Sequence, residues 1–166
     1  MTQTPIAGYQ MRLYRSPVGS DVWTLVGAVQ SVSIENVSRE MIEVAYRGDS
    51  WKRNFPGLME AMEATVKMLH NVEPASEALI RNDFIQGTPA MYAAVNGDIA
   101  APGTEGWTFP AYVVQYNRSE ELTEIVTNDI KLTLGHVMVD GKLVNPEWLI
   151  VTTDSDGEEE GEGGET

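Results

Sequence analysis

Apolar and polar residues alternate along most of this chain, and this period of two is typical of β-strands. The alternation starts with Tyr9, Met11 and Leu13 and continues over residues 24–37 as one long strand or a pair. It returns over residues 42–46, 108–116 and 122–134. A hairpin is expected over 137–144, because Asp140-Gly141 is a typical two-residue turn. The pattern therefore predicts a mainly β protein.

One segment breaks this pattern and predicts a helix over Ala75–Gln86. Pro74 suits a first helical turn, Glu77 is favourable near the positive end of a helix dipole, and Gly87 supplies a C-terminal stop. Leu79, Ile80 and Phe84 are expected to form its apolar face. The helix is therefore expected to bury one face and expose the other.

Residues 64–69 fit two descriptions. Leu58, Met62, Val66 and Leu69 suit one face of a helix, and helix propensity favours that reading slightly. Alternation of apolar residues with polar ones over the same stretch suits a strand instead. We predict a strand, mainly because of the family resemblance given below.

Residues 48–57 form the most polar and most interrupted internal stretch, which predicts a loop or a protruding hairpin. Basic residues gather there around Trp51, and Phe55-Pro56-Gly57 closes the segment. The candidate functional residues of this stretch are Arg47, Asp49, Trp51, Lys52, Arg53 and Phe55. A basic loop on an acidic protein suggests docking onto an acidic face of another copy, and a solvated turn is the plain alternative.

Charge separates the chain into two parts. The 166 residues carry a net charge of −14. Seven negative charges lie beyond Thr153, at Asp154, Asp156, Glu158, Glu159, Glu160, Glu162 and Glu165. Subtracting these seven leaves −7 for the rest, so specific binding to a phosphate backbone is disfavoured throughout. We expect a β domain over residues 1–151 and a disordered acidic tail over 152–166.

No constellation of reactive side chains stands out. The chain has no cysteine, and His70 and His136 lack a metal-ligand spacing. Acids such as Asp83 and Asp129 offer only the chance pairings of an acidic chain. No signal peptide and no membrane-spanning stretch is found, so a cytoplasmic protein without membrane contact is expected. The sequence predicts a protein that is not an enzyme and needs no cofactor and no metal.

Several short segments, in this order, resemble the major tail tube proteins of long, non-contractile bacteriophage tails. The resemblance covers residues 22–135. The segments are Trp23-Thr24-Leu25-Val26-Gly27, Val32-Ser33-Ile34-Glu35, Ile42-Glu43-Val44, Phe55-Pro56-Gly57-Leu58, Ala64-Thr65-Val66-Lys67, Ala78-Leu79-Ile80 with Phe84, Gly87-Thr88-Pro89, and two final strands ending in Leu132-Thr133-Leu134-Gly135. The ordered set carries the resemblance, since no single segment is specific.

This resemblance implies a β-sandwich or barrel-like subunit with one flanking helix. Such subunits form six-fold rings that stack into a hollow tube, and strands of neighbouring copies join into one inner barrel. Residues 47–58 match a loop that reaches the next ring, so their basic residues are expected to meet acids there. The chain departs from some members by carrying only an acidic tail in place of an immunoglobulin-like domain.

The resemblance also implies partners and a location. A tape-measure protein would fill the tube, tail terminator and distal tail proteins would cap its ends, and DNA would pass without specific binding. The protein would belong to the virion tail after assembly in the host cytoplasm. Two alternatives are a tube subunit of a contractile tail or injection system, and a monomeric β-sandwich binding module that uses Trp51, Trp107 and Tyr112.

Overall fold

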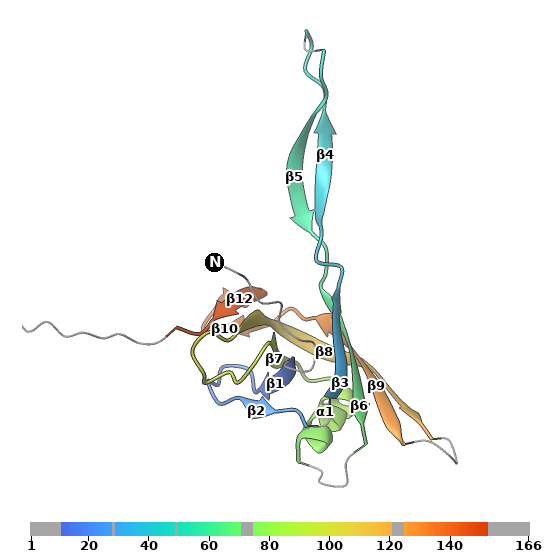
Figure 1. Ribbon diagram of the computed structural model, residues 1–166. Coiled ribbons are helices and arrows are strands. Elements are labelled where there is room, and N and C mark those ends of the chain that lie inside the picture. Colours follow the sequence, from blue (N-terminus) through green and yellow to red (C-terminus); the bar gives the residue numbers. More distant parts are fainter. Residues whose placement is uncertain (1–10, 28, 49, 71–74, 121–124, 153–166) are drawn as a thin grey trace, which may run out of the picture.

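A β-sheet that coils over itself forms the body, and a two-stranded hairpin projects from it (Figure 1). The computed structural model describes residues 11–27, 29–48, 50–70, 75–120 and 125–152. The elements are β1 (Arg12–Ser16), β2 (Thr24–Leu25), β3 (Val29–Glu35), β4 (Arg39–Val44), β5 (Arg53–Met59), β6 (Glu63–Leu69), α1 (Ala75–Gln86), β7 (Ala90–Val95), β8 (Glu105–Ser119), β9 (Thr127–Leu134), β10 (Met138–Val139), β11 (Lys142–Leu143) and β12 (Glu147–Ile150). The predicted mainly β class with one helix is confirmed.

The long strand β8 joins the two halves of the main sheet. The strand order is β2-β1-β7-β8-β9-β6-β3, every pairing is antiparallel, and β12 pairs with β8 as well. The first half of β8 lies between β7 and β12, whereas residues 111–119 pair with β9. A bulge between Val113 and Gln115 adds local twist to the strand. The sheet can therefore bend around β8 and enclose a core.

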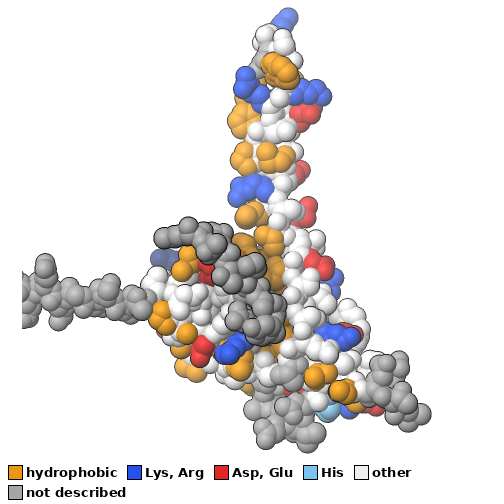
Figure 2. All heavy atoms as spheres, in the orientation of Figure 1, with side chains coloured by type: hydrophobic (Ala, Val, Ile, Leu, Met, Phe, Trp, Pro, Cys, Tyr) orange, Lys and Arg blue, Asp and Glu red, His pale blue; other side chains and the backbone are white. Residues whose placement is uncertain are grey.

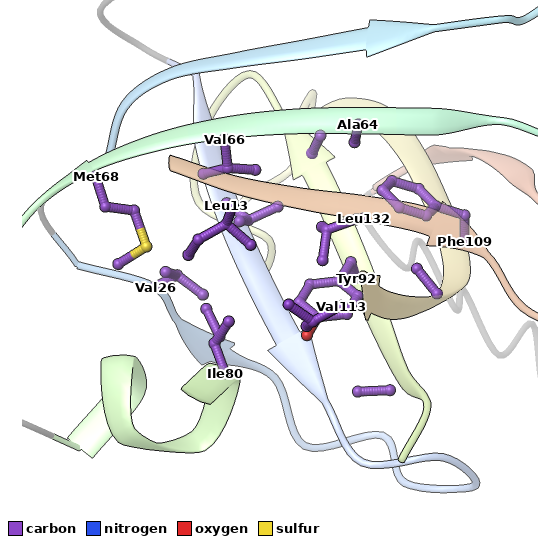
Figure 3. Close-up of a cluster of buried hydrophobic side chains, with 14 of the residues drawn as sticks. Leu13, Val26, Ala64, Val66, Met68, Ile80, Tyr92, Phe109, Val113 and Leu132 are labelled. Atoms are coloured by element: carbon purple, nitrogen blue, oxygen red, sulfur yellow. The ribbon is translucent and has the colours of Figure 1, made fainter. Parts of the chain in front are cut away.

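Strand alternation places the apolar side chains of both halves in one core. Val66, Ile130 and Leu132 are at most 2% exposed, and they face Leu13 and Tyr92 from the other half (Figure 3). Residues 64–69 pair with β3 on one side and β9 on the other, so the predicted strand is correct. Tertiary pairing decides this segment against its helix propensity.

Polar contacts hold α1 on the flank of the sheet more than an apolar stripe does. Of the three apolar residues predicted to face the body, only Ile80 is buried. Leu79 and Phe84 are more than a third exposed, so that part of the prediction is wrong. Phe84 instead lies along the surface and stacks on Tyr116, with 6.4 Å between ring centroids.

Other boundaries differ from the sequence prediction. Of the two descriptions predicted for residues 48–57, a loop or a protruding hairpin, the hairpin is confirmed, and β5 begins at Arg53 in spite of Pro56. An isolated two-stranded ribbon tolerates proline because one edge of each strand faces away from the partner. A loop of nine residues separates β7 from β8. The turn at Asp140-Gly141 is confirmed, with positive φ at both residues.

The acidic tail lies outside the described residues, as does the beginning of the predicted first strand at Tyr9. Asp49 of the candidate loop also lies outside them. The predicted division into a β domain over 1–151 and a tail over 152–166 stays a prediction.

Candidate functional site

The β4–β5 hairpin stands away from the body as a separate two-stranded sheet (Figure 1). It continues the β3–β6 pair, and Glu60 N donates to Ser38 O at 3.0 Å between the two parts. Asn36, where the chain leaves β3, has a φ of 60° that asparagine tolerates better than most residues. β4 and β5 pair only with each other within the described residues. An isolated hairpin of this kind is marginally stable in water and gains from a partner surface.

One face of the hairpin is apolar. Ile42 pairs with Phe55 and Val44 pairs with Arg53, so these four side chains share a face. Tyr46 joins them by packing edge-to-face on Phe55, at 6.5 Å between ring centroids. Ile42, Tyr46 and Phe55 remain about half exposed, and Figure 2 shows apolar side chains along the whole hairpin. Covering such a side chain contributes roughly 1 kcal/mol when half of its surface leaves water.

The opposite face is mixed. Lys52 Nζ lies 2.7 Å from Glu43 Oε1, and both side chains are mostly exposed. Met41 on this face is 55% exposed, and Leu58, at the bulge between Arg39 and Met41, is 82% exposed. An exposed ion pair contributes little, so the apolar side chains dominate what this face offers to a partner.

The structure brings five of the six predicted site residues onto the outer half of the hairpin. These are Arg47, Trp51, Lys52, Arg53 and Phe55. Trp51 is 77% exposed near the tip. Lys52 already has a carboxylate partner in its own chain, which the sequence did not reveal.

Sequence reasoning missed the apolar members of the hairpin surface. Ile42, Val44 and Tyr46 follow the same period of two as core strands, so pattern alone assigns them to the interior. Leu58 also fits the helix face that the sequence allows over the next segment. The one sequence signal was Pro56-Gly57, which is unusual within a strand of a central sheet.

A groove lies where the hairpin meets the body. It holds about 660 Å³ and is lined mainly by apolar side chains. Val37 and Met59 come from the root of the hairpin, whereas Trp107, Leu134 and Pro146 come from the body. Trp107 packs edge-to-face on Trp148, which is itself 51% exposed. The apolar surface of the hairpin therefore continues onto the end of the body.

The end of the body away from the hairpin also exposes apolar side chains. Figure 1 shows α1 and β2 at that end. Leu25 of β2 is 45% exposed, Val22 just before it is 70% exposed, and Ile85 of α1 is 70% exposed. Exposed apolar groups at two opposite ends are the arrangement that head-to-tail contacts require.

A third surface is polar. We use the name polar sheet face for the outward side of β3, β6, β9 and the second half of β8. By strand register its residues are Ser31, Ser33, Glu35, Glu63, Thr65, Lys67, Leu69, Tyr112, Gln115, Asn117, Ser119, Thr127, Asp129, Lys131 and Thr133. A shallow hollow of about 270 Å³ lies in it, between Thr65, Gln115 and Asp129. The other side of the same strands faces the core.

Two buried carboxylates fasten the helix. Glu77 Oε1 accepts hydrogen bonds from Tyr116 Oη at 3.0 Å and Asn128 Nδ2 at 2.8 Å, and it lies 2.9 Å from His70 Nδ1. Burial, with the hydrogen bond to Glu77, raises the pKa of Tyr116 to about 12. His70 thus has a structural partner, while His136 is exposed.

Near the other end of the helix, the Arg15 guanidinium donates two hydrogen bonds to the Asp83 carboxylate, at 2.7 and 2.8 Å. The hydrogen bond to Asp83 raises the pKa of Arg15, and burial raises the pKa of Tyr92. The charges of Arg15 and Asp83 neutralise each other, which suits a structural role. Within the described residues no three metal-ligating side chains are grouped.

The residues proposed for a monomeric binding module do not share a surface. Trp107 and Tyr112 are five residues apart on β8, so they point to opposite faces. Trp51 lies between β4 and β5, in the hairpin that projects from the body.

Comparison with known proteins places the fold. No protein-family model and no curated protein sequence matches the chain. The solved tail of an empty GTA particle, with C6 symmetry, is similar at a TM-score of 0.63 and 12% identity, covering 84% of this chain and 97% of that one. The SPP1 tail tube is similar at 0.65 and 13%, covering 89% and 81%.

The sheath–tube complex of an extracellular contractile injection system, PVC, is similar at a TM-score of 0.57 and 14% identity, covering 89% of this chain and 93% of that one. The fold is thus the tail tube fold shared by phage, GTA and contractile injection system tubes. No helix among the described residues is long and apolar enough to cross a membrane.

Proposed function

We propose that this chain is the subunit of a hollow tail tube, assembled from stacked rings of six copies. The observation that carries the proposal is the projecting β4–β5 hairpin, whose apolar side chains Ile42, Tyr46 and Phe55 remain about half exposed. A tail tube fold over most of the chain supports the same reading. The six-fold number follows the C6 symmetry of the GTA tail.

Ring closure would use the two open edges of the four strands that carry the polar sheet face. Four strands, β3, β6, β9 and the second half of β8, alternate in direction, so β3 runs antiparallel to β8. No described strand pairs with the outer edge of β3, and β7 leaves the edge of β8 beyond Ala111 open. Pairing β3 of one copy with β8 of the next would continue the alternation without interruption. Such pairing also removes two exposed edges, which are otherwise sites of aggregation.

Stacking would use the two apolar ends. The hairpin and the groove at its root lie at one end, and Val22, Leu25 and Ile85 are exposed toward the other. Contacts between unlike ends do not close on themselves, so they build an open polymer along one axis. We propose that the hairpin of each ring lies against the body of the next ring.

We further propose that the tube belongs to a long, non-contractile bacteriophage tail that conducts DNA. The TM-scores of 0.65 and 0.63 for the SPP1 and GTA tubes exceed the 0.57 for the PVC complex, which favours this reading over an injection system. A tape-measure protein inside the tube, and terminator and distal tail proteins at its ends, are then expected partners. The protein would occupy the virion tail after release from the host cytoplasm.

Electron microscopy of purified protein tests the proposal. Negative stain at high protein concentration should show rings with a central hole, or tubes built from them. A strictly monomeric solution by light scattering under every salt condition would contradict it. A tape-measure gene next to the coding gene would support the non-contractile phage reading, and a sheath gene there would favour the contractile alternative.

A further inference from the structure

The polar sheet face contains two lysines: one forms an ion pair with a carboxylate of the same chain, and the other stands across from a carboxylate in the strand register. Lys131 Nζ is 3.0 Å from Glu63 Oε2, and both side chains are only partly exposed. Lys67 stands directly across from Asp129 in the pairing of β6 with β9. Opposite charges at such cross-strand positions attract each other. The third acid of this face, Glu35, accepts a hydrogen bond from Ser33 Oγ at 3.4 Å.

Ring closure decides where this face would point, and the inference therefore rests on the proposed function. The other side of the four strands packs on the core, with β1, β7 and α1 beyond it. When copies pair edge to edge, there is room for the core and for β1, β7 and α1 only on the outside of the ring. The polar sheet face would then form the inner wall, and any DNA in the tube would pass along it.

A lysine on such a wall presents a hazard to transport. Unpaired cations bind phosphates and release counterions, and this binding strengthens with every additional contact. Repetition around a ring and along a tube would multiply the contacts. A carboxylate on the neighbouring strand, paired with Lys131 and opposite Lys67 in the register, offsets that attraction.

We propose that Glu63 and Asp129 act as fixed counterions that keep Lys131 and Lys67 from gripping the DNA backbone. With three acids and two lysines the face carries a charge of −1 per copy. Arg118, at the far end of β8, is likewise paired with Glu120. We attribute the weak binding of DNA to the carboxylate that partners each cation, and not to the small net charge of the face alone.

Two single substitutions that change the net charge by the same amount distinguish the effect of the carboxylate partner from the effect of net charge. Glu63→Gln removes one acid and exposes Lys131. Glu35→Gln removes one acid from the same face and leaves the partners of both lysines in place, so it is the matched control. Tubes of each variant, first verified by negative stain, are sedimented with a short fluorescent duplex DNA, and the retained DNA is measured.

We expect Glu63→Gln combined with Asp129→Asn to retain about tenfold more DNA than the unmodified protein near 50 mM salt, and to lose this excess by about 200 mM. Glu63→Gln alone should exceed Glu35→Gln. Adding Lys67→Gln and Lys131→Gln should return retention to the original level. Equal retention by the Glu63 and Glu35 variants, or no increase in either, would overturn the proposal.

A second measurement covers variants that fail to assemble. The polar sheet face is open in the separate subunit, so the same ranking of variants is expected when duplex DNA is titrated into unassembled protein. A flat ranking there would also overturn the counterion role. Absence of tubes from the unmodified protein, in contrast, would count against the proposed function alone.

Discussion

Glu77 and Asp83 attach the helix to the sheet, a role that an apolar face of the helix has in most small domains. Each carboxylate is buried, and each collects donors from two or more strands or loops. A buried carboxylate with several donors is stabilising, whereas the loss of one partner leaves the others unsatisfied. The helix position therefore depends on a few specific side chains.

Replacing Glu77 with glutamine is expected to destabilise the fold. The amide can accept only part of the hydrogen bonding and loses the charge that strengthens it, so we expect a loss of about 1–3 kcal/mol in the free energy of unfolding. Urea unfolding followed by circular dichroism measures it. Glu60→Gln, at an exposed position, is the control, and an equal midpoint for the two variants would show that Glu77 does not fasten the helix.

Tyr116 is expected to make the fold sensitive to alkali. Its pKa is about 12 in the folded chain, against an ordinary value of 10. Between these values the unfolded chain has lost the phenol proton and the folded chain has kept it, so stability is full below pH 10 and falls toward pH 12. The raised pKa of Tyr92 acts in the same direction.

Thermal unfolding across this pH range measures the effect. Tyr116→Phe should be less stable at neutral pH, because it loses the hydrogen bond to Glu77, and its stability should fall less steeply with alkali. Tyr46→Phe, on the projecting hairpin, is the matched control. An alkaline slope unchanged by Tyr116→Phe would contradict the assignment.

The elements that could be predicted are those whose apolar face is covered by other parts of the same chain. The strand at residues 64–69 was predicted by its period of two, with help from the family resemblance, although its helix propensity is higher. The helix was predicted from its terminal residues, Pro74, Glu77 and Gly87. The final turn followed from Asp140-Gly141.

The projecting hairpin could not be predicted fully, for a physical reason. Its alternation of apolar and polar residues is the same as that of a core strand, because both serve to bury one face. The pattern does not say whether the covering surface belongs to the same chain. The ion pair of Lys52 with Glu43 and the polar anchors of α1 are contacts between side chains of different elements, which a period cannot encode.

Charge reversal on the hairpin should impair stacking and spare the fold. Lys52→Glu with Arg53→Glu places new negative charges on a surface expected to meet an acidic protein, and turns the Lys52–Glu43 contact repulsive. We expect rings without tubes by negative stain, with an unchanged unfolding midpoint for the body. Lys142→Glu, on exposed β11, is the control. Normal tubes from the double variant would remove the assigned role of these two residues.

For the molecule as a whole, charge and assembly are linked. Half of the net charge of −14 lies beyond Thr153, so the part that packs into rings carries −7. Like charge on many copies opposes association at low salt and weakens as salt screens it. The apolar surfaces of the hairpin and its root must outweigh that repulsion for tubes to form.

Removing residues 154–166 should leave the fold intact and make assembly no weaker. These residues are too polar to bury, and their seven acids add repulsion between copies. Unfolding midpoints and light scattering of the full and shortened chains provide the comparison. A loss of folding on removal would show that the tail is part of the folded domain.

Shortening the hairpin separates the two steps of assembly. In the shortened chain an Asn-Gly turn replaces residues 40–58 and joins the paired residues Arg39 and Met59, which leaves β3, β6 and the polar sheet face as they are. The full chain and the shortened chain are imaged by negative stain at the same high concentration. Tubes from the full chain and separate rings from the shortened one are the predicted result. Monomers from the full chain, or ordinary tubes from the shortened chain, would contradict assembly through the hairpin.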